Sequence, residues 1–345
     1  MPCIVQMLAA RGETPVSEKE YATNAGPRTI SRSLRFLQSL FLYRNTSLVL
    51  FLVIIWTILA NVTPYFFKAD NIVLILRQST TVGIMGIGMT MVIISGGIDL
   101  SVGAVAALSA MIDGILLMKL HLPFIVALVG ALGVGVCFGI FNGLLVSRFR
   151  LQPMVVTLGT MSIARGLTLI STSGRPIFVL NPTMMAIGNG ELLGVPIQVY
   201  VLVGLFLAGL VALNLTYFGR YVYSIGGNEE ATRLSGIFVQ RYKVFLYVIT
   251  GFCASTVGIV LVGLLGASEP TTGIGLELDA IAVSAIGGTS LMGGVGGLGG
   301  TMLGALLIGT LKNGLTILNV VSYYQQVLIG VVIIMAVLID SLRKR

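Results

Sequence analysis

Long apolar runs recur along most of the chain, separated by short polar segments. Only 10% of the 345 residues are charged and 56% are hydrophobic, whereas a soluble domain carries about 25% charged residues. A helix that crosses a bilayer needs about 20 apolar residues. The chain is therefore predicted to be an all-α polytopic membrane protein with about ten transmembrane helices. The ten runs are 47–67, 72–95, 102–118, 123–146, 155–171, 198–215, 244–265, 278–292, 301–318 and 326–342.

The polar segments divide the chain into three parts. Residues 1–46 are predicted to form a cytoplasmic N-terminal tail without a cleavable leader, 47–342 a single transmembrane domain, and 343–345 a basic C-terminal end. The eighth run, 278–292, is short and rich in glycine, which predicts a broken or re-entrant helix. Such a segment survives at membrane depth only where its free backbone groups are buried in protein or face water.

The basic residues indicate the orientation of the chain. Lys and Arg accumulate in cytoplasmic loops. With the N-terminus inside, fifteen of the 21 bases fall on the cytoplasmic side, four fall outside, and Arg165 and Lys312 lie within spans. Both termini are therefore predicted to be cytoplasmic. The bases stand between apolar runs, so the net charge of +8 indicates a lipid bilayer and no nucleic acid as partner.

The sequence offers no residues for several kinds of chemistry. No lysine follows a glycine, which excludes the phosphate-binding Gly-Lys-Ser/Thr loop, and the glycines at 294, 296 and 299 have no strand before them and are interpreted as a flexible turn. The single histidine, His121, can supply neither a hydrolytic triad nor a metal site. We expect no catalytic, cofactor or metal residues and no enzymatic activity in this chain.

Glycines at four-residue spacing indicate close helix packing, as is usual in lipid. Gly135, Gly139 and Gly143 form one such series, and Gly300 and Gly304 form a second. Each series is expected to pack inside one subunit or against a second copy of the chain.

The loop between the sixth and seventh runs, residues 219–243, is predicted to contain a short cytoplasmic helix. Asn228 is a good N-cap, acidic residues at 229 and 230 complement the positive helix start, and Gly236 can end the helix in the left-handed conformation. Ala231 and Leu234 then share one face. This small apolar ridge is suited to docking into a groove of a partner.

The same segment, Glu230-Ala-Thr-Arg-Leu-Ser-Gly236, resembles the EAA-x-x-x-G signature of ABC importer permeases, with Thr232 where the signature has Ala. In that family the loop couples the permease to its ATP-binding subunit. The resemblance implies an ATPase-coupling role for Asn228, Glu229, Glu230, Ala231, Thr232, Arg233, Leu234 and Gly236.

Residues 94–104, which include Gly-Ile-Asp-Leu-Ser-Val-Gly, resemble a segment of ribose-type sugar permeases in this superfamily. Segments 276–282, 287–294 and 322–325 resemble it in matching order, and the similarity runs from about residue 34 to 345. It implies a permease in the bacterial plasma membrane, paired with a second permease copy as homodimer or heterodimer. It also implies a cytoplasmic ATPase with two nucleotide-binding halves and an extracytoplasmic sugar-binding protein.

The motif at 96–101 is expected to reverse the chain between the second and third runs. Gly96 and Gly97 permit a tight reversal. Asp99 is expected to N-cap the third span, with a gating or subunit-contact role for Asp99, Leu100 and Ser101 as the alternative.

The two cations within spans are energetically unfavourable, because inserting each near the bilayer centre costs roughly 2.5 to 3.5 kcal/mol of free energy. Both must therefore face protein or water. Arg165 could line a polar translocation path, and Lys312, next to Asn313, could belong to the path, snorkel, or pair with a carboxylate. The polar residues expected beside Arg165 are Asn142, Thr157, Thr160 and Thr168.

The acidic residues predicted on the external side either receive the binding protein or are simply solvated. They are Asp70, Glu191, Glu269, Glu277 and Asp279.

The resulting hypothesis is a permease subunit of an ATP-driven importer that carries a monosaccharide, with ribose as first candidate. Xylose, allose and galactose are the other sugars considered. The rival hypothesis is a stand-alone transporter driven by an ion or proton gradient, with Asp99, Arg165 or Lys312 as a relay. A purely structural or receptor protein is disfavoured, because polar residues recur within the spans.

Overall fold

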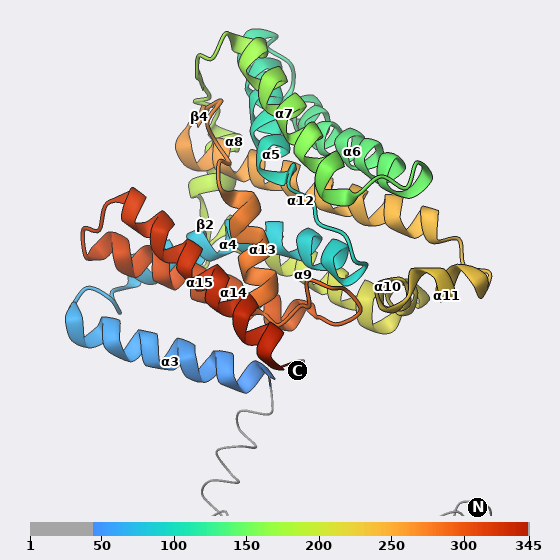
Figure 1. Cartoon of the computed structure of the whole chain (residues 1–345). Coiled ribbons are helices and arrows are strands. Elements are labelled where there is room, and N and C mark those ends of the chain that lie inside the picture. The colour runs from blue at the N-terminus through green and yellow to red at the C-terminus, as the bar shows by residue number, and fades with distance from the viewer. Residues whose placement is uncertain (1–43, 344–345) are drawn as a thin grey trace, which may run out of the picture. The chain divides into compact units, whose positions relative to one another are not determined.

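The computed structural model describes residues 44–343 and is almost entirely helical. Figure 1 shows the arrangement of the helices. The helices of the first half are α3 (Arg44–Val62), α4 (Ala69–Ile94), α5 (Val102–Gly114) with its π-helical continuation η1 (Ile115–Lys119), α6 (Phe124–Arg148), α7 (Pro153–Thr172), α8 (Pro182–Asn189) and α9 (Ile197–Leu215). Those of the second half are α10 (Tyr217–Gly227), α11 (Glu229–Leu234), α12 (Val239–Leu265), α13 (Leu276–Ile286), α14 (Leu298–Ile317) and α15 (Ser322–Arg343).

Within residues 44–343, four two-residue strands form two small antiparallel pairs in the loops. β1 (Ile177–Phe178) pairs with β4 (Ala267–Ser268), with Ile177 opposite Ser268. β2 (Glu191–Leu192) pairs with β3 (Val195–Pro196). The fold is therefore that of a helical protein whose strands only fasten loops.

Six of the described helical segments are long and apolar enough to cross a membrane: α4, α5 with η1, α6, α7, α9 and α12. A shorter apolar helical stretch covers Thr46–Val62 in α3. These helices confirm a polytopic membrane protein, while ten spans and cytoplasmic termini stay predictions. Among the described residues the first helix, α3, begins at Arg44 rather than near residue 47, and most of the predicted N-terminal tail lies outside them.

The centre of the helical region is built around α4 and α12. Every residue of α4 from Ser79 to Ile94 is buried, as expected for a helix that is apolar on all sides. α12 packs against α6, α4 and α5, and α14 packs against α4. Figure 1 shows α12 lying between α6 and α4. By contrast, α6 and α9 expose many large apolar residues, such as Val129 and Leu207, which suits contact with lipid.

Glycines bring the backbones of α6 and α12 into contact. A Cβ atom at Gly135 would lie 2.0 Å from the carbonyl oxygen of Gly251, and one at Gly143 would lie 2.6 Å from the Cα of Val244. Gly139 meets the backbone of Tyr247 in the same way. This series therefore packs inside one subunit, which was one of the two expected alternatives.

The eighth apolar run forms only a short helix. α13 ends at Ile286, and the chain runs through a glycine-rich reversal, residues 287–297, before α14 begins. Gly288, Gly293 and Gly294 in this reversal have positive φ angles of 81°, 86° and 73°, which side chains rarely permit. The prediction of a broken helix is confirmed. Gly294 and Gly296 lie in the turn, as interpreted, whereas Gly299 already belongs to α14.

Candidate functional site

The predicted cytoplasmic helix is present as α11 and has the expected caps. The side-chain oxygen of Asn228 accepts a hydrogen bond from the backbone N–H of Ala231 at 2.9 Å. After Ser235 the chain passes through Gly236 with a φ of +85°. These two residues bound the helix as the sequence indicated.

One side of α11 is held against the rest of the protein. Thr232 is only 3% exposed, and its hydroxyl lies 2.8 Å from that of Ser224 on α10. Glu229 forms an ion pair with Lys243 of α12 at 2.5 Å. Thr232, which departs from the family signature, is thus the buried anchor of the helix.

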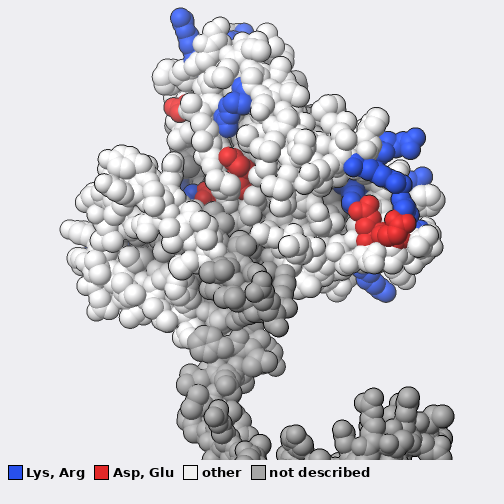
Figure 2. Space-filling model, viewed as in Figure 1, with Lys and Arg blue, Asp and Glu red and all other residues white. Residues whose placement is uncertain are grey.

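The other side of α11 is open. Leu234 is 79% exposed, and Glu230, Ala231 and Arg233 are exposed as well. Figure 2 shows that Lys, Arg, Asp and Glu gather over the end of the molecule where Figure 1 places α10 and α11, whereas much of the rest of this face is uncharged. The predicted apolar ridge is therefore exposed to solvent and surrounded by charged side chains.

Glu230 and Arg233 form an ion pair at 2.5 Å on this open side. The hydrogen bond donated by Arg233 lowers the pKa of the Glu230 carboxyl group, and the same bond raises the pKa of the Arg233 guanidinium. Both groups thus stay charged across the physiological pH range.

Behind α11, three backbone segments meet at glycines. A Cβ atom at Gly226, near the end of α10, would lie 1.7 Å from the carbonyl oxygen of Ile94 at the end of α4. The N–H of Gly294 donates to that same oxygen at 2.8 Å, and Gly293 lies against Gly96. We call this contact of residues 94–96, 226–227 and 293–294 the glycine junction. It connects α10, the helix before α11, with the reversal after α4 and with the glycine-rich reversal after α13.

Asp99 does not cap α5, which corrects the prediction. The N-cap position is Ser101, which makes no side-chain capping bond. Instead, the Asp99 carboxylate accepts from the backbone N–H of Ser101 at 2.9 Å and from its hydroxyl at 2.6 Å. Asn142 of α6 donates to that hydroxyl at 2.9 Å. These bonds from Asp99 to the residue two positions later stabilise a turn in the loop before α5. Gly96 reverses the chain earlier in the same loop, with a φ of +82°.

The residues predicted to line a polar path are not brought together. Thr157, Thr160 and Thr168 are buried, and their hydroxyls donate to carbonyl oxygens of α7; that of Thr157 also lies 3.4 Å from the carbonyl oxygen of Ile98. Asn142 belongs to the Asp99 cluster. Arg165 reaches the loop before α13, where it donates to the carbonyl oxygens of Pro270 at 2.7 Å and Thr272 at 3.1 Å.

Arg165 also borders a pocket of about 430 Å³ between α7 and α13. Glu277 at the start of α13 and Ser162 line it as well. Arg165 therefore faces a cavity, while an ordered path through one subunit stays a prediction.

Lys312 pairs with a carboxylate, one of the alternatives left open. Its ammonium group on α14 donates to Asp279 of α13. Asp279 is 5% exposed, so its assignment to an exposed acidic external surface was wrong. Of the other acids in that group, Glu191 pairs with Arg77 at 3.3 Å, Asp70 and Glu269 are exposed, and Glu277 is half-buried.

Sequence reasoning missed one buried acid. Asp113 in α5 is fully buried, and neither carboxylate oxygen has a hydrogen-bond partner among residues 44–343. A single Asp in an apolar run carries no motif, so only its position in the fold reveals it. The three groups proposed as an ion relay, Asp99, Arg165 and Lys312, each have separate partners in the described region.

Comparison with known proteins gives a family. Residues 71–337 match the family described as the permease component of branched-chain amino acid transport systems. The chain belongs to this permease family. The match includes α11, the glycine junction and the Asp99 cluster, and together with the apolar helices it makes the chain a multi-pass protein of the inner membrane.

Individual family members are similar over most of their length. A ribose import permease of Haemophilus influenzae is 41% identical over 305 residues, which cover 87% of this chain and 94% of that protein. A ribose import permease of Bacillus subtilis is 44% identical, covering 84% and 90%. A D-allose transport permease of Escherichia coli is 39% identical with the same coverage, 84% and 90%. No solved structure matches the chain.

Proposed function

We propose that this chain is the membrane-spanning subunit of an ATP-driven importer that carries a monosaccharide, with ribose as first candidate. The observation that carries the proposal is the identity of 41% and 44% to two ribose import permeases over nearly their whole length. An extracytoplasmic binding protein delivers the sugar, and a cytoplasmic partner with two nucleotide-binding halves hydrolyses ATP.

The polar groups of this chain suit a neutral substrate. The buried hydroxyls and amides at Thr157, Thr160, Thr168 and Asn142 are uncharged, and Lys312 is neutralised by Asp279. A sugar needs hydrogen-bonding groups rather than counter-charges. The family is nevertheless described for branched-chain amino acids, so an amino acid is the competitor that the transport experiment must include.

The coupling proposal uses the open face of α11. In this proposal the chain has ten spans with both termini in the cytoplasm, and α11 lies on the cytoplasmic side. There Ala231, Leu234 and the Glu230–Arg233 pair dock into the ATP-binding subunit, and two permease copies enclose the path. ATP-driven movement of that partner reaches the membrane region through α11.

Uptake in a deletion strain tests the function. Cells that lack this chain are complemented with it, and uptake of radiolabelled ribose is measured with unlabelled allose, xylose, galactose or leucine as competitor. We expect ATP-dependent ribose uptake that sugars reduce and leucine does not. Inhibition by leucine alone, or no ribose uptake, would overturn the substrate assignment.

Reconstitution tests whether the chain transports solute only together with the ATPase and the binding protein. The purified chain in vesicles with a proton or sodium gradient should move no solute without the ATPase and the binding protein. Uphill transport by the isolated chain would establish the gradient-driven alternative instead. Co-purification of the ATP-binding subunit with the chain supplies the matching positive result.

A further inference from the structure

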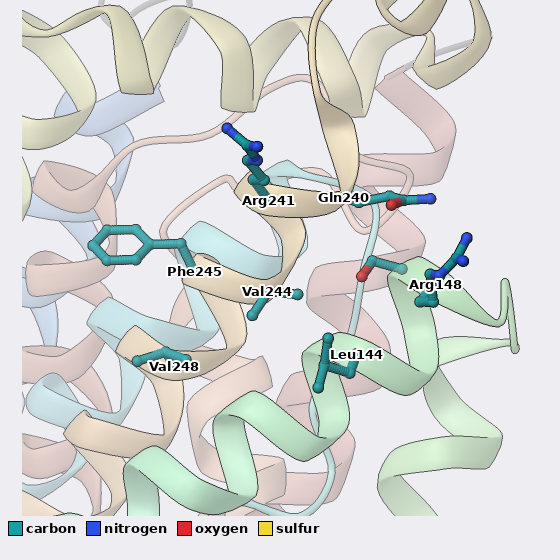
Figure 3. Close-up of a pocket in the computed structure, with 8 residues that line it drawn as sticks. Leu144, Arg148, Gln240, Arg241, Val244, Phe245 and Val248 are labelled. Atoms are coloured by element: carbon teal, nitrogen blue, oxygen red, sulfur yellow. The ribbon is translucent and has the colours of Figure 1, made fainter.

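A groove of about 400 Å³ lies between the last turns of α6 and the first turns of α12. Figure 3 shows Arg148, Gln240 and Arg241 at one end of it and Leu144 and Val248 further along the helices. The groove is distinct from α11 and from the pocket beside Arg165. Its lining residues are Leu144, Ser147, Arg148, Gln240, Arg241, Val244, Phe245 and Val248.

The groove changes from polar to apolar along the helix axes. Arg148 is the last residue of α6, and Arg241 is in the first turn of α12. At about 1.5 Å per residue, Leu144 lies roughly 6 Å deeper than Arg148, and Val248 roughly 10 Å deeper than Arg241. Both helices are candidate membrane spans. The polar end therefore lies at a membrane boundary and the apolar end beneath it.

The polar end carries cations without counter-charges. In the part of the chain that the structure describes, neither Arg148 nor Arg241 has a carboxylate partner, and Arg241 stacks on the ring of Phe238 at 4.9 Å. The N-terminus of α12 adds positive potential at the same place. Arg148 and Arg241 both line this end of the groove, so an anion there would be attracted by two positive charges and by the helix start.

A buried hydroxyl lining the groove is the second indication of a ligand. Ser147 is 7% exposed, and its Oγ has no hydrogen-bond partner within residues 44–343. A buried polar group without a hydrogen-bond partner is energetically unfavourable. A ligand oxygen at the polar end would supply the missing bond.

We propose that this groove binds one anionic phospholipid. The phosphate lies between Arg148 and Arg241 within reach of Ser147, and one acyl chain follows Leu144, Val244, Phe245 and Val248 into the bilayer. Charge complementarity selects an anionic headgroup over a zwitterionic one. A cytoplasmic protein would cover only the polar end, because the apolar end lies below the membrane boundary.

Lipid retention measured by native mass spectrometry tests this proposal. The delipidated full chain in detergent is titrated with phosphatidylglycerol and with phosphatidylcholine of the same acyl chains. Each basic residue near a membrane surface contributes about 1 kcal/mol toward anionic lipid, so two predict about 30-fold tighter binding of phosphatidylglycerol. Equal binding of the two lipids would overturn the proposal.

Variants locate the site. Arg148→Gln with Arg241→Gln should remove the 30-fold preference and leave phosphatidylcholine binding unchanged. The matched control is Arg220→Gln, since Arg220 is an exposed arginine of α10 that stacks on Tyr217 outside the groove; it should keep the full preference. A preference that survives the double substitution places the lipid elsewhere and overturns the assignment.

A second variant tests the groove independently, in case the double substitution of Arg148 and Arg241 disturbs folding. Leu144→Trp fills the apolar half of the groove and leaves both arginines in place, and Leu144 is 46% exposed, so the added volume points outward. We expect phosphatidylglycerol retention to fall at least severalfold while the elution profile of the protein is unchanged. Retention equal to that of the unmodified chain would exclude the groove.

Discussion

The ammonium group of Lys312 on α14 contacts the carboxylate of Asp279 on α13, 33 residues earlier in the chain. The side chain of Asp279 is 7% exposed and that of Lys312 is 25% exposed. Two charges that would each be unfavourable in an apolar region therefore neutralise one another. The pair also joins the short helix α13 to its neighbour α14, on the far side of the glycine-rich reversal.

Removal of one partner should be more harmful than removal of both. Lys312→Met leaves the Asp279 charge uncompensated, and the free energy of unfolding should fall by about 3–5 kcal/mol. The double variant Lys312→Met with Asp279→Leu should recover most of this loss. Thermal unfolding in detergent measures both. A double variant as unstable as the single one would contradict this account of the pair.

The contact between α6 and α12 offers a matched pair of glycines. Gly135→Ala places a Cβ atom 2.0 Å from the Gly251 carbonyl oxygen, so the helices must separate, at about 1–3 kcal/mol. Gly133→Ala, on the same helix, meets no atom within 4 Å and should be neutral or stabilising by up to about 1 kcal/mol. Apparent melting temperatures in detergent compare the two. Similar effects at both positions would show that packing does not decide the difference.

The Asp99 cluster should depend on the Ser101 hydroxyl. Ser101→Ala removes the donor to Asp99 and the acceptor for Asn142, and leaving these buried groups unpaired should cost about 1–3 kcal/mol. Ser162→Ala, whose hydroxyl is exposed on α7, is the control and should change stability little. Thermal unfolding and ribose uptake are measured together. Unchanged stability in Ser101→Ala would mean that water replaces the hydroxyl.

Changes on α11 should separate ATP hydrolysis from transport. Glu230→Arg places a second cation beside Arg233, and Gly236→Pro imposes a φ near −65° where the chain has +85°. We expect both variants to insert normally, to retain ATP hydrolysis by the assembled importer, and to lose most ribose uptake. Ser235→Ala, which only removes a hydroxyl bond within α11, should transport normally. Full uptake in both variants would refute the coupling role.

Much of the helical framework follows from local sequence. The caps of α11 could be predicted because Asn228 bonds to a group three residues away and Gly236 needs only its own backbone freedom. The break after α13 was visible in its glycines for the same reason. Apolar runs likewise indicate where helices lie, because burial in lipid requires apolar side chains.

The partners of polar residues could not be predicted in the same way. Asp279 lies 33 residues before Lys312, and Asn142 lies 41 residues after Ser101, so no spacing rule joins them. Asp99 was expected to cap a helix, because a cap and a loop turn use the same kind of oxygen and the same short distance along the chain. Which of them forms depends on α6, whose Asn142 completes the cluster.

The glycine junction has a consequence for how force travels from α11. At this point the main chains of α4, α10 and the reversal after α13 touch without intervening side chains. Side-chain rotation cannot absorb a displacement there, because there are no rotamers to change. A partner that tilts α11 would therefore displace the end of α4 and the reversal before α14 directly.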